Sequence, residues 1–317
     1  MTLAGPTLRR WPRALLWSLL AAAMLGAMAL TIDPLGTFNA LMPKDRASTR
    51  VAQGVPYGAG ERLKLDVYAP RSTGASKRPV ILFFYGGSWN SGRRQGYAFA
   101  ARALAARGFV VIVPDYRLVP EARYPDFLHD CAAAVRWARR HSGDYGGDGE
   151  RIVLTGHSAG AYNAAMLALD PSLLGPDRAA IRGLAGLAGP YDFLPLDDAS
   201  TIAAFGAWPE AAETQPINHA AAGAPPTLLL HGASDTRVKP RNSRKLAGLL
   251  RAAGSEVRLE VYPGVGHVGI LTALAIPFRR KAPALADVAD FASEVTGERS
   301  RAKVRRPVKS TPHVERR

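Results

Sequence analysis

Short apolar runs alternate with longer segments of helical periodicity along most of the chain. Runs of four to eight apolar residues bounded by glycine, proline or polar residues are typical of buried strands. Eight runs fit this description, the first two joined by the turn Gly58-Ala59-Gly60: residues 50–57, 63–68, 80–85, 110–114, 152–155, 184–187, 227–230 and 257–262. Together they predict a sheet of eight strands.

The segments between these runs have the apolar spacing of amphipathic helices. The predicted helices cover residues 94–107, 127–141, 159–169, 241–253 and 284–296. In the second of them, Cys131 shares an apolar stripe with Phe127 and Val135, so we interpret it as a packed core thiol. Strands that alternate with helices indicate the α/β class, with a mostly parallel sheet flanked by helices.

Residues 190–224 interrupt this alternation between the sixth and seventh predicted strands. Phe193, Phe205 and Trp208 occur there among prolines, alanines and acidic residues. Two interpretations remain open: a small cap over a functional site, or a surface excursion that packs its aromatic side chains on the core.

The N-terminal segment is apolar enough to interact with a membrane. Residues 14–32 contain no charged side chain, and a helix of this length covers ~28 Å, close to the ~30 Å of a bilayer core. Arginines precede it, which favours an N-terminus in the cytoplasm and export of the remaining chain. The sequence predicts a cell-membrane anchor with a periplasmic, extracytoplasmic domain. The alternative is a secreted or periplasmic protein whose signal peptide is cleaved near Ala27-Met28-Ala29.

The same patterns divide the chain into four parts. Residues 1–32 are the signal-anchor or signal peptide, 33–49 a linker, and 50–297 the α/β domain with the cap candidate at 190–224. Residues 298–317 are basic, contain Pro307 and Pro312, and have no apolar periodicity. They predict a disordered tail.

The net charge of +15 is concentrated at the two ends of the chain. Residues 1–32 carry three arginines and no acid, and residues 298–317 carry eight basic residues against two glutamates. Nine of the excess charges therefore lie outside the α/β domain, and no nucleic-acid partner is expected. The seven histidines show no metal-ligand spacing. We expect neither a metal nor a cofactor, and the oligomeric state stays open.

Gly156-His157-Ser158-Ala159-Gly160 has the form G-x-S-x-G and stands between a predicted strand and an alanine-rich predicted helix. This context is typical of a nucleophile elbow, a turn so tight that only small residues flank the serine. It predicts Ser158 as a nucleophile and the N–H of Ala159, at a helix N-terminus, as an oxyanion donor.

A serine hydroxyl needs a base and an acid that orients the base. Asp235 follows the strand at 227–230, and His267 follows the strand at 257–262, so both reach the sheet edge that carries Ser158. We predict His267 as the base and Asp235 as the acid. His231 is the competing base, but it precedes the acid in the chain.

Tyr85-Gly86-Gly87-Ser88-Trp89 follows the strand at 80–85. Adjacent glycines let the backbone approach a ligand closely and direct its N–H groups toward it. Gly87 and Ser88, with Ala159, are the predicted oxyanion donors. Asp115-Tyr116-Arg117, after the fourth strand, is expected to brace this loop.

Residues 50–295 resemble the carboxylesterase branch of the α/β hydrolases. The resemblance rests on these motifs and on Asp115-Tyr116-Arg117-Leu118. That branch includes hormone-sensitive-lipase-like, feruloyl-esterase-like and kynurenine-formamidase-like enzymes. Many members have a histidine where this chain has Tyr85, and Trp89 favours the feruloyl-esterase and formamidase side. The resemblance implies an α/β-hydrolase fold and hydrolysis of a small carboxylic ester through an acyl-enzyme on Ser158. The alternatives are a peptidase or amidase with the same triad and, from another class, a catalytically silent tethered binding protein.

Overall fold

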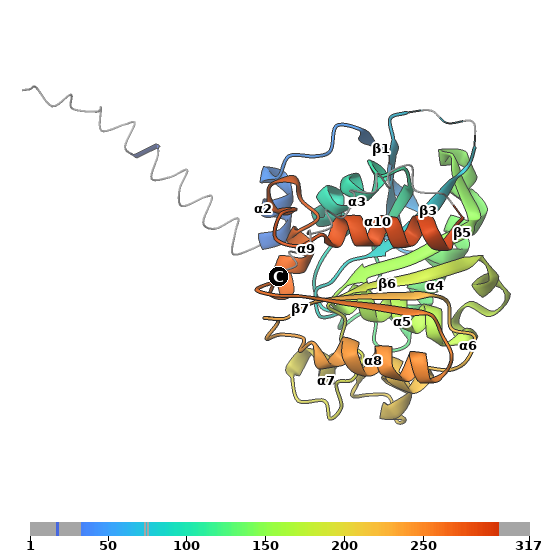
Figure 1. Ribbon diagram of the computed structural model, residues 1–317. Coiled ribbons are helices and arrows are strands. Elements are labelled where there is room, and N and C mark those ends of the chain that lie inside the picture. The colour runs from blue at the N-terminus through green and yellow to red at the C-terminus, as the bar shows by residue number, and fades with distance from the viewer. Residues whose placement is uncertain (1–16, 19–32, 73, 75, 298–317) are drawn as a thin grey trace, which may run out of the picture.

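An eight-stranded sheet forms the centre of the computed structural model, which describes residues 17–18, 33–72, 74 and 76–297 (Figure 1). The strands follow one another in the spatial order β1-β2-β4-β3-β5-β6-β7-β8. Their bounds are β1 Ser48–Pro56, β2 Lys64–Pro70, β3 Arg78–Phe84, β4 Val110–Pro114, β5 Gly147–His157, β6 Ile181–Leu187, β7 Thr227–Gly232 and β8 Val257–Tyr262. All eight predicted strands are present.

The sheet is parallel from β4 to β8 and antiparallel at β1 and β2. Every residue of β4 and β7 is buried, which explains the apolar runs at residues 110–114 and 228–230. β1, at the edge, is mostly half-buried or exposed and contains register shifts. The predicted α/β class with a mostly parallel sheet flanked by helices is confirmed.

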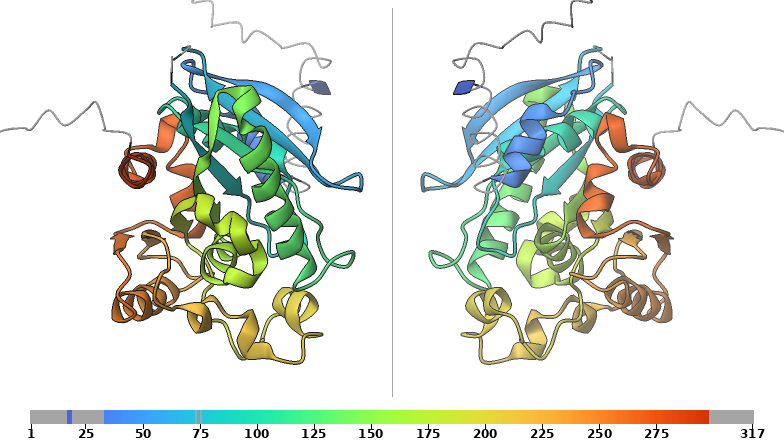
Figure 2. Two further views of the ribbon diagram at one scale, coloured as in Figure 1. Left: turned by 90° about the vertical axis from the view of Figure 1, so that its right-hand side faces the viewer. Right: turned by 90° about the vertical axis from the view of Figure 1, so that its left-hand side faces the viewer.

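Helices cover both faces of the sheet. In Figure 2, α10 lies on one face and α4 and α5 lie on the other. All five predicted helices are present as α3 Ala98–Ala105, α4 Asp126–His141, α5 Ala159–Leu169, α8 Arg241–Ala252 and α10 Ala284–Val295. The first starts with a 3₁₀ turn, Arg94–Tyr97. Cys131 on α4 is fully buried, as expected for a core thiol.

One helix lies in the segment that the sequence predicted as a linker. α2, Pro34–Leu41, begins at the N-cap Asp33, whose carboxylate accepts a hydrogen bond from the N–H of Gly36 at 2.9 Å. Its Phe38 ring packs edge-on against Phe99 of α3, with ring centroids 5.1 Å apart. Aspartate followed by proline is a helix-start signature. The linker prediction overlooked it.

Residues 190–224 connect β6 to β7 through short helical segments. These are α7 Ala199–Phe205 and the 3₁₀ turns Ala211–Thr214 and Pro216–His219. Phe193 and Phe205 pack against Trp89, with ring centroids 6.1 and 4.7 Å apart. The stretch from Pro190 to Thr201 also lines a pocket. This segment therefore both contacts the core and borders the pocket.

The predicted membrane anchor, with its periplasmic localisation, is not supported and is corrected here. In the part of the chain that the structure describes, no helix has the length and apolar character that a membrane crossing requires. The longest helix there, α4, has 16 residues, fewer than the ~20 that a span needs, and it is amphipathic. Most of the segment behind the prediction, residues 14–32, lies outside the described residues.

Candidate active site

Ser158 occupies a strained turn between the end of β5 and the start of α5. Its backbone angles, φ 56° and ψ −124°, lie in a region that only glycine adopts easily. A side chain held this way typically costs about 1–3 kcal/mol. The surrounding structure compensates for that cost, and the turn projects the hydroxyl from the sheet edge.

The two glycines of the elbow are required by close backbone packing. A Cβ atom on Gly156 would lie 2.3 Å from the carbonyl group of Gly160. A Cβ on Gly160 would lie 2.1 Å from the carbonyl oxygen of Phe84, at the end of β3. Because these neighbours are backbone atoms, a rotamer change cannot relieve the clash.

We expect Gly160→Ala to destabilise the protein by about 3 kcal/mol or more, since over-packing against backbone exceeds the usual cost of about 1–3 kcal/mol. Urea unfolding followed by circular dichroism measures the change. Gly248→Ala is the matched control: Gly248 lies in α8 with no atom within 4 Å of the Cβ position. That control should stabilise the protein by about 0.5–1 kcal/mol. Equal effects of the two changes would contradict the packing argument.

Three side chains from separate strand ends form a continuous hydrogen-bonded chain. The Oγ of Ser158 lies 2.9 Å from Nε2 of His267, and Nδ1 of the same imidazole lies 2.8 Å from Oδ2 of Asp235. His267 is the first residue of α9, His267–Thr272, just beyond β8. The structure thus brings together the three residues predicted as nucleophile, base and acid.

Asp235 is buried and held by more than one donor. Its Oδ1 accepts hydrogen bonds from the N–H groups of Arg237 and Val238, both at 2.9 Å. Burial alone would raise the pKa of Asp235. Hydrogen bonds from His231, His267 and the Val238 N–H outweigh burial and lower that pKa well below its usual value. The carboxylate is therefore ionised at any working pH and favours a proton on Nδ1 of His267.

His231, the competing base, does not contact the serine. Its side chain is fully buried, with Nδ1 2.7 Å from the hydroxyl of Ser243 and Nε2 2.7 Å from the carbonyl oxygen of Val238. The same Nε2 lies 3.3 Å from Oδ2 of Asp235. The Val238 carbonyl only accepts, so Nε2 of His231 donates. His231 supports the loop that carries the acid.

The loop after β3 has the backbone conformation of a ligand-binding turn. Gly87, Ser88 and Trp89 all have positive φ, at 137°, 51° and 58°. A Cβ on Gly87 would lie 2.2 Å from the carbonyl oxygen of Ser91, so only glycine fits there. Within the described residues, the N–H groups of Gly87, Ser88 and Ala159 donate to no other protein group. These three N–H groups are therefore available to a ligand.

Two tyrosine hydroxyls and the indole of Trp89 hold this loop by hydrogen bonds. The Tyr116 hydroxyl donates to the carbonyl of Tyr85 at 2.7 Å, and the Tyr97 hydroxyl accepts from the N–H of Gly86 at 2.9 Å. The indole N–H of Trp89 donates to Oδ1 of Asn163 at 3.1 Å. The expected brace after the fourth strand thus acts through Tyr116.

Asp115 contributes to the same brace by a different route. Its Oδ1 accepts a hydrogen bond at 2.7 Å from the N–H of Arg94, in the segment that leaves the loop. The guanidinium of Arg94 also bridges Asp115 and the buried Asp66. This buried ion cluster fixes the far end of the loop.

His157 has a role that the sequence did not reveal. Its Nε2 donates to the main-chain carbonyl of His267 at 3.0 Å, and the two rings are 4.9 Å apart. The ring is buried, and its Nδ1 has no partner among the described residues. Burial, followed by the charge of His267, lowers the pKa of His157 to about 3. A neutral imidazole at the x position of G-x-S-x-G thus tethers the backbone of the candidate base.

We expect this histidine to make folding sensitive to acid. The folded pKa is about 3, whereas the unfolded value is about 6.5, so between these pH values the unfolded chain binds a proton that the folded chain excludes. Stability is unaffected above that window and falls with pH inside it. Lowering the pH from about 7.5 to about 5.5 should cost about 1.4 kcal/mol through His157.

Urea unfolding of wild type and of His157→Gln across that pH range measures the contribution of His157 to the pH dependence of stability. The other titrating groups are common to both proteins, so the difference in pH dependence isolates His157. The variant should lose about 1.4 kcal/mol less than wild type. Equal losses in both proteins would show that His157 is protonated in the folded state.

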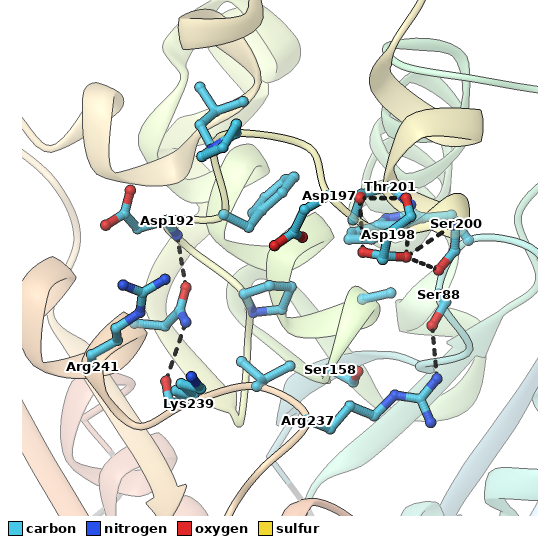
Figure 3. A pocket seen from close by; sticks show the side chains of 18 residues that line it. Ser88, Ser158, Asp192, Asp197, Asp198, Ser200, Thr201, Arg237, Lys239 and Arg241 are labelled. Carbon is cyan, nitrogen blue, oxygen red and sulfur yellow. Dashed lines mark hydrogen bonds between the residues drawn. The ribbon is translucent and has the colours of Figure 1, made fainter.

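A pocket of about 470 Å³ opens beside Ser158 (Figure 3). The loop after β3 and the start of α5 contribute Ser88, Trp89 and Ala159 to its lining. One wall comes from the segment after β6 and the other from the segment after β7. Six of the lining side chains are charged, three of them acidic and three basic.

Comparison with known proteins supports the structural assignment. The BD-FAE family model matches residues 65–250, more than half of the chain. The esterase LipC of Mycobacterium tuberculosis is 33% identical over 240 residues, which cover 67% of this chain and 58% of LipC. The isoprenylcysteine alpha-carbonyl methylesterase ICME of Arabidopsis thaliana is 28% identical over 249 residues, 70% of this chain and 58% of ICME. The chain thus spans less than two thirds of these relatives.

Solved structures share the fold at lower sequence identity. A truncated carbohydrate esterase from gut microbiota superposes with a TM-score of 0.70 at 22% identity, over 81% of this chain and 99% of that chain. Esterase 2 of Thermogutta terrifontis with bound butyrate gives 0.65 at 23% identity, over 81% and 97%. At this identity the likeness concerns the fold, and the family follows from the sequence match. The chain belongs to the BD-FAE family, within the carboxylesterase and feruloyl-esterase-like α/β hydrolases.

Proposed function

We propose that the protein is a serine hydrolase that cleaves a small carboxylic ester through an acyl-enzyme on Ser158. The hydrogen-bonded chain from Ser158 through His267 to Asp235 carries this proposal. Ser88 and Ala159, two of the residues with unused N–H groups, line the pocket beside this chain. The named esterase relatives support ester hydrolysis as the general activity.

The first half-reaction transfers the acyl group to the enzyme. His267 takes the hydroxyl proton while Oγ of Ser158 forms a bond to the ester carbonyl carbon. The carbonyl oxygen becomes an oxyanion, which accepts hydrogen bonds from the N–H groups of Gly87, Ser88 and Ala159. As the intermediate collapses, the imidazolium gives the proton to the departing alkoxide, and the alcohol leaves.

The second half-reaction returns the enzyme to its starting state. His267 takes a proton from water, and the resulting hydroxide bonds to the acyl carbon. Collapse of the second tetrahedral intermediate breaks the bond to Ser158, whose oxygen regains the proton from His267. The products are one carboxylic acid and one alcohol.

We assign substrate selection to residues 190–224, which act as a small cap. The catalytic domain that carries this cap runs from β1 to α10.

Labelling with a fluorophosphonate probe tests this function. We expect one phosphonyl group per chain, on the tryptic peptide that contains Ser158, and loss of activity in parallel with labelling. 4-Nitrophenyl acetate and the matched 4-nitroacetanilide then separate an esterase from an amidase or peptidase. Faster turnover of the anilide would favour the amidase alternative. Absence of labelling would favour a catalytically silent binding protein.

A further inference from the structure

Three cations without an ion-pair partner line the pocket beside Ser158. Arg237, Lys239 and Arg241 all line the wall that follows β7. Among the described residues, none of these three side chains takes part in an ion pair, whereas 15 ion pairs occur elsewhere in that part of the chain. Three cations lie at alternate positions along five residues, at the entrance to one site.

The opposite wall carries three carboxylates, Asp192, Asp197 and Asp198, but none of them forms an ion pair with these cations. Asp192 pairs with Lys245 at 2.7 Å, outside the pocket lining. Asp198 is the N-cap of α7, and its carboxylate accepts hydrogen bonds from the hydroxyl groups of Ser200 and Thr201. Within the described residues, Asp197 is the pocket's one carboxylate without a partner. The three cations therefore remain unpaired although the formal charges of the pocket lining balance.

Arg237 is the cation best placed to act on a substrate. Its Nη2 lies 3.3 Å from the hydroxyl of Ser88, a residue of the oxyanion loop. Figure 3 shows its guanidinium group directed toward Ser88. Only one of its five N–H donors is used in this contact. The remaining donors are available at the reacting end of the pocket.

A guanidinium group with free donors binds a carboxylate through two parallel hydrogen bonds. We propose that the preferred substrate is an ester that bears a carboxylate, which Arg237 binds with support from Lys239 and Arg241. This inference rests on the proposed esterase function and specifies its substrate class. The carboxylate lies on either the acid or the alcohol part of the ester, close enough to the scissile bond to reach Arg237.

Matched pairs of esters test the inference and locate the charge. 4-Acetoxybenzoate and its neutral methyl ester differ by one charge on the alcohol part. Monomethyl adipate and methyl hexanoate differ by one charge on the acyl part. For wild type, kcat/KM should be about tenfold or more higher for the anionic member of at least one pair, and added salt should reduce this preference.

Variants assign the preference to Arg237. In Arg237→Gln, the anionic-to-neutral ratio of kcat/KM should fall about tenfold or more, and Arg237→Lys should restore part of it. The ratio cancels any general effect on the oxyanion loop. Arg244→Gln is the matched control, because Arg244 is exposed on the same helix as Arg241 but does not line the pocket. It removes the same charge and should leave the ratio within about twofold.

The outcomes separate the two proposals. Hydrolysis of the neutral esters without a preference for the anionic ones, or a ratio unchanged in Arg237→Gln, would overturn the substrate class and leave the esterase function standing. Equal loss of the ratio in Arg244→Gln would attribute it to long-range charge and overturn the role of Arg237. No hydrolysis of any of the four esters by wild type would overturn both proposals.

Discussion

Ser158→Ala should lower kcat on 4-nitrophenyl acetate by about 10⁴–10⁶ while the fold remains intact. The change removes only Oγ, the atom that His267 contacts at 2.9 Å. Without it no acyl-enzyme forms. The oxyanion N–H groups and the pocket remain, so a small residual rate above that of water is expected.

Initial rates, with circular dichroism and urea unfolding on the same preparation, measure this effect. Ser293→Ala is the matched control, since Ser293 lies on α10 and its hydroxyl has no partner within the described residues. Its activity should equal that of wild type. A Ser158→Ala protein that kept more than about one per cent of wild-type activity would show that another group is the nucleophile.

A second variant at this position separates strain from chemistry. Ser158→Gly should also be inactive, but it removes the penalty for a side chain at φ 56°. That relief of about 1–3 kcal/mol exceeds the entropic cost of a glycine, about 0.5–1 kcal/mol. The glycine variant is therefore expected to be more stable than the alanine variant. The difference would measure the strain stored in the elbow.

The sequence predicted the sheet and the positions of the site residues because both depend on local patterns. β4, for example, is buried along its whole length, so its apolar run ends where the strand ends. Residues that follow parallel strands share one sheet edge, and this rule predicts Asp235 and His267 beside Ser158 from the sequence alone.

Features that depend on contacts distant in the sequence were missed. Phe38 of α2 is half-buried against Phe99, 61 residues later, and no periodicity in a helix of eight residues predicts that contact. His157 binds the carbonyl of a residue 110 positions away. The unpaired charges of Arg237 and Arg241 indicate a binding site only because the fold places them in a pocket that four separate segments line. Such pairings require the assembled fold.

His267→Ala should lower kcat by about 10⁴–10⁶, as much as loss of the serine, because nucleophile and base act as one unit. The variant leaves Ser158 without an acceptor for its proton. Fluorophosphonate labelling should slow in parallel, since the probe needs the same activated oxygen. Added imidazole is expected to restore part of the activity in the space that the side chain leaves.

The decisive comparison is with His231→Gln, because His231 is the other histidine within reach of Asp235. It lies 3.3 Å from that carboxylate and makes no hydrogen bond to Ser158. Loss of a hydrogen bond to the ionised carboxylate, worth about 1.5–3 kcal/mol, should reduce kcat by about a hundredfold at most, and imidazole should not change it. A folded His231→Gln protein as inactive as His267→Ala would reverse the assignment of the base. With the observed geometry, the proton of Ser158 has one direct acceptor among the described side chains, Nε2 of His267.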